Sequence, residues 1–529
     1  MKHSPVPGRL SRMRWTRAVV CAATLSIIAG CGAGPSDRPG VAVERAPVGG
    51  NPSASAAPAP PPNAELPTTD LAWRDCTAPT VNLLGLGPAP AGVVLECAEY
   101  STPIDATGGV IGNFRNGAMR ARLAQTPKDA VPLVLTSGSD RSSTATLAGL
   151  AVGQPGGILA DRPIVAVDRR GIGTSQPIDC LRPEVRKGLA DNAQFGRDGT
   201  DPVDAMNKFS QDGTIDCRDF LTPYEGTFDN AHTADDIEQL RKQWQVDHID
   251  LLGTGNGASV ALDYARKYHD HVARLVLDSP EAVGADGVTK GEQQVQGAEA
   301  ALTAFAQRCT GVGCSLGLDP RGKVIDLVRQ ADSGGLGDIS AQALLTAITG
   351  FLGGPRADQV SRIGELADTL SSAARGDRKA LGDLILRESA AVSGDGQFVN
   401  RCTDSQQPPT ATKSKELVDT WGQKYPAFGK SAAIALMACS AWPAAAPPPA
   451  LRELPIPVLV LSSIADPVVG NGGLASVNGA LGNAGARHAT INWQGWGHPV
   501  STHSGCAQNA VLAYLTDAKL PEDGTACPA

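Results

Sequence analysis

The chain has 529 residues, 42% of them hydrophobic and 19% charged, and a formal net charge of −8 at neutral pH. This length and composition exclude an intrinsically disordered chain and suit one large domain with a sizeable insertion, or two domains. The excess of acidic residues argues against nucleic acid as a partner.

The N-terminus carries the pattern of a secretory signal. Residues 1–30 contain five Lys or Arg and no acidic residue, and an apolar run over 18–30 ends at Cys31. The run is too short to favour a membrane-spanning helix. Residues 28–31, Ile-Ala-Gly-Cys, resemble the lipobox of bacterial lipoproteins. This implies acylation of Cys31 and a lipid anchor on the extracytoplasmic face of the membrane, with secretion of part of the protein as a further route. A plain cleaved signal that precedes a chance cysteine is the alternative.

The segment after the signal differs in composition from the rest of the chain. Removal of residues 1–30 takes away five positive charges and lowers the formal charge from −8 to −13. Residues 31–70 are rich in Pro, Ala, Gly and Ser, a composition that cannot bury a core. We therefore expect a lipid anchor and a stiff, extended linker at 31–70, and a folded body that begins near Leu71.

Ten cysteines remain when Cys21 and Cys31 are set aside. An even number in an exported chain predicts disulfides, and pairing of sequence neighbours would give five short loops, although the connectivity stays open. A zinc site is not expected, because no pair has Cys-x-x-Cys spacing with a histidine at ligand distance. The disulfide candidates are Cys76, Cys97, Cys180, Cys217, Cys309, Cys314, Cys402, Cys439, Cys506 and Cys527.

Apolar runs and helical periodicity alternate along the body of the chain. Strands are predicted at 131–135, 164–167, 249–252, 275–277, 458–461 and 489–493, and helices at 232–245, 257–268 and near 507–515. Such alternation indicates an α/β fold with a mostly parallel central sheet. Between 283 and 448 only helical patterns occur, at 293–308, 340–352, 358–374, 379–388 and 415–438. We predict a core at 71–282 and 449–529 with a helical cap inserted at 283–448.

The turn after the strand at 249–252 reads Gly253-Thr254-Gly255-Asn256-Gly257. α/β-Hydrolases place their nucleophile in a Gly-x-Ser-x-Gly elbow between a strand and a helix, with an acid and a histidine later in the chain. Gly255 stands where this serine would be. Asp466, just past a late strand, is the acid candidate, and His498, after the last strand, is the base candidate.

Several segments together resemble the actinobacterial tripeptidyl-aminopeptidase family of α/β-hydrolases, over about residues 73–527. They are Glu96-Cys97-Ala98-Glu99-Tyr100, the segment from Asp168 to Ser175, Cys402 and Cys439 in the cap, and the C-terminal block His498, Cys506, Tyr514, Leu515, Leu520, Pro521, Gly524, Thr525 and Cys527. The resemblance implies the α/β-hydrolase fold and serine exopeptidase chemistry, with Asp466 orienting His498 and no cofactor or metal.

The chain departs from this family at two places. The nucleophile is replaced by Gly255, and loss of the nucleophile from a Ser-His-Asp site lowers turnover about a million-fold. The loop that supplies oxyanion donors in the family corresponds to 136–142, where Gly138 and Ser139 are the candidates. The chain is then either a hydrolase for peptides or small esters and amides, or an inactive pseudo-hydrolase that binds a peptide, lipid or cell-wall ligand. The sequence leaves the oligomeric state open.

Other residues near the site have competing interpretations. Thr254, Ser139 and Ser259 are possible substitute nucleophiles, and His498 acting on water is a further route. Asp466 and His498 are equally well explained as a structural pair, and His503 as a surface residue. Two acids near the cap, Glu281 and Asp404, face a peptide amino group or are plain surface acids. Asp168 to Gly171 reads as a turn at a strand end.

The same elbow also fits a dinucleotide-binding pattern in form. Gly253-x-Gly255-x-x-Ala258 follows a strand and opens a helix, and Asp278 lies twenty residues further on. That pattern usually belongs to the first strand of its sheet, whereas several strands precede this one. We expect Asp278 to be an ordinary acid at a strand end.

Overall fold

The computed structural model describes residues 61–529 except 155, 197–198 and 393, and these belong to one compact unit. The predicted signal peptide, Cys31 and most of the predicted linker lie outside the described residues. Among the described residues, no helix is long and apolar enough to cross a membrane.

The strands of the described residues form a single sheet in the order β1-β2-β3-β5-β4-β6-β7-β8-β9-β10. The pairs β1–β2, β2–β3 and β3–β5 are antiparallel. All further pairs, from β5–β4 to β9–β10, are parallel. The α/β class and the mostly parallel sheet are therefore confirmed. The strands are β1 (Arg74–Asp75), β2 (Val93–Pro103), β3 (Asn113–Leu123), β4 (Leu133–Thr136), β5 (Ile164–Val167), β6 (Ile249–Thr254), β7 (Val272–Asp278), β8 (Val458–Ala465), β9 (His488–Trp496) and β10 (Thr525–Cys527).

Helices cover both faces of the parallel part of the sheet. In β4, Leu133 and Leu135 pack on one face while Val134 packs on the other, and all three are fully buried. This is why the parallel strands read as continuous apolar runs in the sequence. One face is covered by α2 (Ser143–Gly153), α3 (Ile158–Asp161) and α18 (Gly505–Asp517), the other by α6 (Asn230–Trp244), α7 (Gly257–Lys267) and α16 (Leu474–Asn483).

The long hairpin of β2 and β3 was not predicted as strands. Its burial alternates irregularly, so it lacks the continuous apolar run of the parallel strands. Part of its cross-strand pairing is ionic: Glu96 Oε2 accepts from Arg120 Nε at 2.9 Å and from Arg122 Nε at 3.0 Å.

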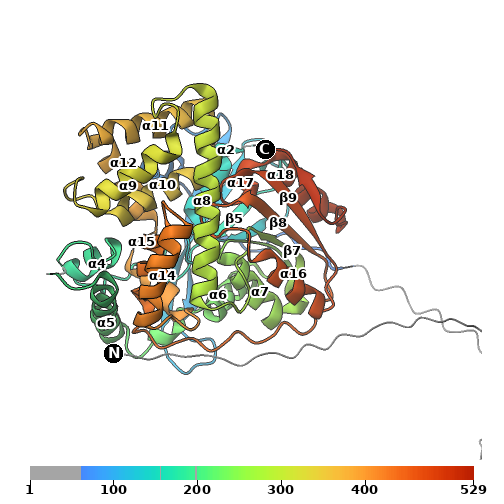
Figure 1. Cartoon of the computed structure of the whole chain (residues 1–529). Helices are drawn as coiled ribbons and strands as arrows, with labels where there is room; N and C mark the ends of the chain where they lie inside the picture. The colour runs from blue at the N-terminus through green and yellow to red at the C-terminus, as the bar shows by residue number, and fades with distance from the viewer. Residues whose placement is uncertain (1–60, 155, 197–198, 393) are drawn as a thin grey trace, which may run out of the picture. The chain divides into compact units, whose positions relative to one another are not determined.

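Helices fill the chain between β7 and β8 (Figure 1), and most of them share one apolar cluster that includes Phe305, Leu344, Ile348 and Leu366. The long α8 contacts both β8 and the neighbouring helices. The helix predicted over 415–438 is divided, because Pro426 disfavours helix at Tyr425. The helices are α8 (Gly287–Val312), α9 (Pro320–Asp332), α10 (Ala341–Gly353), α11 (Val360–Ala374), α12 (Lys379–Val392), α13 (Asp395–Thr403), α14 (Ala411–Lys424) and α15 (Gly429–Ala435).

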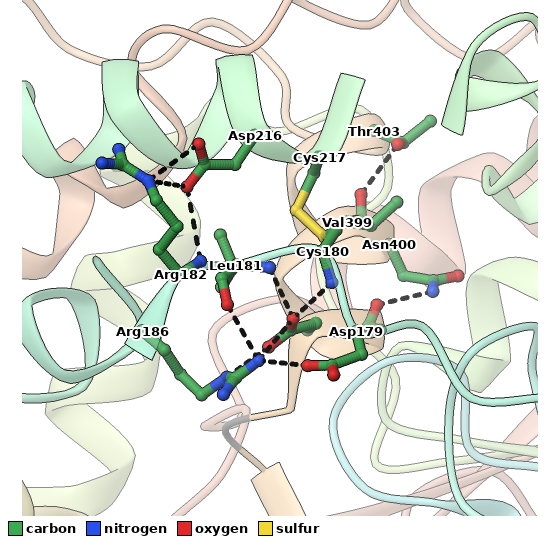
Figure 2. Close-up of a disulfide and its surroundings, with 12 residues drawn as sticks. Asp179, Cys180, Leu181, Arg182, Arg186, Asp216, Cys217, Val399, Asn400 and Thr403 are labelled. Atoms are coloured by element: carbon green, nitrogen blue, oxygen red, sulfur yellow. Dashed lines mark hydrogen bonds and ion pairs between the residues drawn. A yellow bond between two sulfur atoms is a disulfide. The ribbon is translucent and has the colours of Figure 1, made fainter. Parts of the chain in front are cut away.

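Two further helices lie between β5 and β6, α4 (Pro183–Ala190) and α5 (Pro202–Leu221), and a disulfide joins Cys180, just before α4, to Cys217 in α5 (Figure 2). Beside it, the buried carboxylate of Asp395, at the start of α13, accepts the backbone N–H groups of Cys180 and Leu181 at 2.8 and 2.7 Å. It also accepts both Nε and Nη2 of Arg186, at 2.7 and 2.9 Å. A charged clamp therefore joins this region to α13. Short helices α1 (Thr77–Leu83) and α17 (Val500–His503) complete the fold.

All ten body cysteines form disulfides, each with its neighbour in the sequence. The pairs are Cys76–Cys97, Cys180–Cys217, Cys309–Cys314, Cys402–Cys439 and Cys506–Cys527. Five disulfides suggest an oxidising, extracellular environment.

The end of the predicted linker is part of the folded unit rather than a free tether. The carbonyl of Pro62 accepts from Arg274 Nη1 at 2.6 Å, Glu65 Oε2 accepts the N–H of Asp247 at 2.9 Å, and Thr68 N donates to the carbonyl of Trp244 at 3.0 Å. Ordered contacts with the core thus begin before Leu71.

Candidate active site

The elbow after β6 has the backbone of a nucleophile turn. β6 ends at Thr254, Gly255 has φ of +57°, and α7 begins at Gly257. The turn is held by Gly255 N, which donates to the carbonyl of Asp278 at 3.0 Å. A Cβ at Gly257 would lie 2.0 Å from the carbonyl oxygen of Thr136, so this tight turn requires glycine there.

Gly255 lies at the apex and faces His498. A Cβ at Gly255 would be 3.1 Å from His498 Nε2, which is where the side chain of a nucleophile would lie. The same Cβ would be only 2.4 Å from Asp140 Oδ2. The space that a serine side chain would use is therefore bordered by an imidazole and by a carboxylate.

Asp466 and His498 lie together at the carboxyl ends of β8 and β9. His498 Nδ1 and Asp466 Oδ2 are 2.8 Å apart, and the Asp466 side chain is 1% exposed. Asp466 Oδ1 accepts the N–H groups of Val468 and Val469 at 2.8 and 3.0 Å, which fixes the carboxylate. Because Nδ1 is engaged by Asp466, the other ring nitrogen of His498 faces the apex.

Burial alone would lower the pKa of His498, but neighbouring charge outweighs it. The charge and hydrogen bond of Asp466, with smaller contributions from Asp140 and Asp278, raise the pKa of His498 above its ordinary value. The imidazole is therefore more basic than a free histidine, as a proton acceptor paired with a carboxylate should be.

Asp140, which the sequence analysis did not single out, accepts a hydrogen bond from the backbone at the elbow. In an α/β-hydrolase the N–H of the residue after the nucleophile stabilises the oxyanion. Here that N–H belongs to Asn256, and it donates to Asp140 Oδ2 at 2.6 Å. Burial, together with the charge of Glu281, raises the pKa of Asp140 to about 6. The only signal in the sequence was an acid in the loop 136–142.

The other candidates of this loop contribute contacts rather than free donors. Ser139 N and Oγ donate to Asn256 Oδ1 at 3.1 and 3.2 Å. Gly138 has φ of +62°, and a Cβ there would lie 2.3 Å from the same oxygen. Both residues thus support the backbone around Asn256.

Among the described residues, none of the substitute nucleophiles forms a hydrogen bond with His498. Thr254 is fully buried and its hydroxyl donates to Ser137 Oγ at 2.8 Å. The hydroxyl of Ser139 is bonded to Asn256, and Ser259 is not among the residues that line the cavity at the site.

A cavity of about 500 Å³ opens at the elbow between the core and the helices α8, α10, α12, α13 and α15. Asp140, Asn256 and His498 line its core side. Glu281 and Asp404 also line it, so neither is a plain surface acid: Glu281 pairs with Lys290 at 3.3 Å and Asp404 with Arg169 at 2.7 Å. Among the described residues, no His, Cys, Asp and Glu cluster is suited to a metal ion.

Three residues around the site, His503, Asp278 and Asp168, also had predicted roles. His503 is not a surface residue, because its ring stacks on Trp493 with centroids 5.3 Å apart and its Nε2 contacts the carbonyl of Gly353. Asp278 is fully buried and accepts the N–H groups of Val500 and Ser501, so it is not placed to bind a ribose. Asp168 is a strand-end turn residue, as predicted, with its carboxylate bonded to Thr144 and Thr174.

Comparison with known proteins assigns the C-terminal region. Residues 425–527, which contain Asp466 and His498, match a family model described as TAP-like protein. No curated protein matches the chain by sequence. Among solved structures, proline iminopeptidase of Mycobacterium smegmatis is 13% identical over 79% of this chain and 98% of its own, with a TM-score of 0.36. The bromoperoxidase from Bacillus anthracis is 13% identical over 79% of this chain and 100% of its own, with a TM-score of 0.35.

The fold assignment depends on the strand order and the family match rather than on these two distant similarities. The described chain has the α/β-hydrolase fold, and its residues 425–527 are similar to the TAP-like proteins of that fold.

Proposed function

We propose that this protein is an exported pseudo-hydrolase, anchored by lipid on Cys31, that holds a short peptide in the cavity between core and cap without hydrolysing it through a serine. The observation that carries the proposal is the position of Asp140. Its carboxylate accepts the Asn256 N–H and borders the empty side-chain position of Gly255. Acyl transfer needs a nucleophile and a donor free to stabilise an oxyanion, and an anion already bound to that donor opposes both.

The size and lining of the cavity support a peptide as the ligand. A volume of about 500 Å³ suits a small molecule or a few residues of a peptide. Charged side chains of both signs line it, including Glu281, Lys290, Arg401 and Asp404, together with apolar residues of α8 and α10. Such a lining suits a ligand that carries both charges and apolar side chains.

A second candidate function is hydrolysis by water that His498 activates. It is favoured by the retained pair: Nδ1 of His498 is bound to Asp466, and Nε2 faces the cavity side of the elbow. A neutral imidazole in that arrangement can take a proton from water.

One experiment separates the two functions. The purified protein and its His498→Ala variant are each given tripeptidyl amides and short esters, and binding of the same peptides is measured by calorimetry. Binding without turnover supports the pseudo-hydrolase. Turnover that His498→Ala abolishes would reject it and support activated water. Absence of both binding and turnover would reject a peptide as the ligand.

The lipid anchor is tested separately. We expect the full chain to partition with membranes and the Cys31→Ala variant to be released into the soluble fraction. A Cys31→Ala variant that still carries acyl chains would contradict the proposal.

A further inference from the structure

Asp140 differs from the other acids of the cavity because, among the described residues, no Lys or Arg side chain pairs with its carboxylate. Glu281 pairs with Lys290 at 3.3 Å, Asp404 with Arg169 at 2.7 Å and Glu388 with Arg141 at 2.8 Å. Among the ion pairs of the described residues, none includes the Asp140 carboxylate. The charges of His498 and Arg401 lower the pKa of Asp140, but Arg401 contacts the backbone carbonyl of Asp140, at 3.4 Å, instead of the carboxylate.

The Asp140 carboxylate is held in place and directed at the cavity. Oδ2 accepts from Asn256 N at 2.6 Å, while Oδ1 accepts no hydrogen bond from the described residues, and Asp140 lines the cavity. Holding a carboxylate partly away from bulk water with no Lys or Arg partner is costly, so a positive group that enters the cavity is stabilised beside it.

His498 supplies a second acceptor at the elbow, across the side-chain position of Gly255 from Asp140. The Cβ position of Gly255 lies 2.4 Å from Asp140 Oδ2 and 3.1 Å from His498 Nε2. Because Asp466 accepts the proton on Nδ1, Nε2 of a neutral His498 offers a lone pair there. A group with several N–H donors therefore finds two acceptors at the elbow, where a serine hydrolase would place a carbonyl carbon.

We infer that the elbow is a cation site: the ligand places a primary ammonium group between Asp140 and His498, with Gly255 providing the space. This inference rests on the proposed binding function and specifies which group of the ligand binds at the elbow. It also reverses the polarity of the site, since a hydrolase elbow stabilises developing negative charge and this one binds positive charge. The ammonium can come from the free amino end of a peptide or from an amino sugar.

The charged groups around Asp140 determine how binding depends on pH. Glu281 raises the pKa of Asp140, whereas His498 and Arg401 lower it, and Lys290 faces it from α8. An ammonium ion favours the ionised carboxylate and the neutral imidazole. Binding should therefore weaken as the pH falls, because His498, whose pKa is raised, becomes charged first and Asp140 takes up a proton below about 6.

The first test compares free and blocked amines on the purified protein. Binding of trialanine and N-acetyl-trialanine, and of glucosamine and N-acetylglucosamine, is measured by calorimetry at pH 7.5. If the ligand is a peptide, acetylation of trialanine should weaken binding at least about tenfold, and if it is an amino sugar, acetylation of glucosamine should do so. Loss of a charged hydrogen bond has an effect of this size. Asp140→Asn should bind the free and acetylated forms equally. Equal binding of both forms by the natural protein would overturn the cation site while leaving peptide binding in place.

The second test uses n-butylammonium as a minimal probe at pH 6. If the probe lowers the pKa of Asp140, its binding releases protons, which calorimetry in buffers of different ionisation enthalpy measures. We expect the natural protein to release protons when the probe binds, and His498→Gln to release fewer. In Asp140→Asn the carboxyl is absent, so its share of the proton release should disappear. Release that is the same in Asp140→Asn as in the natural protein would overturn the inference. Release with the probe but no binding of any peptide would reject the peptide ligand and retain the cation site.

Discussion

The backbone N–H of Asn256 donates to the carboxylate of Asp140 at 2.6 Å, across the turn whose apex is Gly255. In the proposed pseudo-hydrolase, the two departures from a serine hydrolase are thus adjacent. The missing side chain leaves the space, and the acid from the preceding loop borders it and bonds the donor that an oxyanion would need.

This contact predicts that a serine alone will not restore activity. In Gly255→Ser, the new Cβ would meet Asp140 Oδ2 at 2.4 Å, and the Asn256 N–H would remain occupied. We expect Gly255→Ser and Asp140→Gly to be inactive on p-nitrophenyl esters and tripeptidyl amides, and the double variant to exceed both by at least about a hundredfold, the cost of one oxyanion donor. His498→Ala added to the double variant is the control and should remove the gain. Full activity of Gly255→Ser alone would contradict the role given to Asp140.

Asp140 also predicts a stability difference that depends on pH. Its carboxyl has an ordinary pKa of 3.8 when unfolded and about 6 when folded, so the folded state holds its proton over a range where the unfolded state has lost it. Its contribution to stability is therefore lost as the pH rises from about 4 to 6. Asp140→Asn removes this loss. We therefore expect the free energy of unfolding of Asp140→Asn, relative to that of the natural protein, to rise by about 2 kcal/mol between pH 4 and 7. This is less than full burial would give, because water in the cavity screens the charge.

That expectation is measured by chemical denaturation of both proteins at several pH values. A stability difference that stays constant between pH 4 and 7 would show that Asp140 does not titrate in this range.

The clamp that Asp395 forms beside the Cys180–Cys217 disulfide, the disulfide drawn in Figure 2, predicts a large loss of stability on mutation away from the cavity. Asp395 is 2% exposed and accepts two backbone N–H groups and both nitrogens of Arg186 that face it. Asp395→Ala leaves these donors without an acceptor, and we expect it to lower the free energy of unfolding by about 3 kcal/mol. Asp216→Ala is the matched control, since its partner Arg182 is 54% exposed and the pair should contribute less than about 1 kcal/mol. Equal losses would contradict the clamp.

The disulfides predict a dependence on loop length. Cys180–Cys217 joins residues 37 apart in the sequence, whereas Cys309–Cys314 joins residues 5 apart. By chain entropy, replacing both cysteines with serine should cost about 4 kcal/mol for the first pair and about 2 kcal/mol for the second. Thermal unfolding of the two double variants measures the difference, and a larger loss from the shorter loop would show that strain or packing dominates.

Several parts of the fold followed from local patterns. The strands at 164–167 and 249–252 and the helix at 257–268 are β5, β6 and α7 within a few residues, because a strand buried on both faces must be apolar throughout and a helix must repeat its apolar face. The hairpin of β2 and β3, the helices α4, α5, α9 and α13, and the division at Tyr425 were missed. Partly exposed strands and half-polar helices do not differ enough from loops when each is considered alone.

For the site, the sequence by itself determined the elbow, with Gly255 at its apex, and pointed to Asp466 and His498, since each is recognised from its own neighbours in the chain. Only the tertiary structure decided that Asp466 and His498 are 2.8 Å apart, that Glu281 and Asp404 face one cavity, and that Asp140 bonds to Asn256. These three pairs of residues are separated by 32, 123 and 116 positions in the sequence, respectively. No local pattern records them, because they arise from the order in which the strands assemble into one sheet.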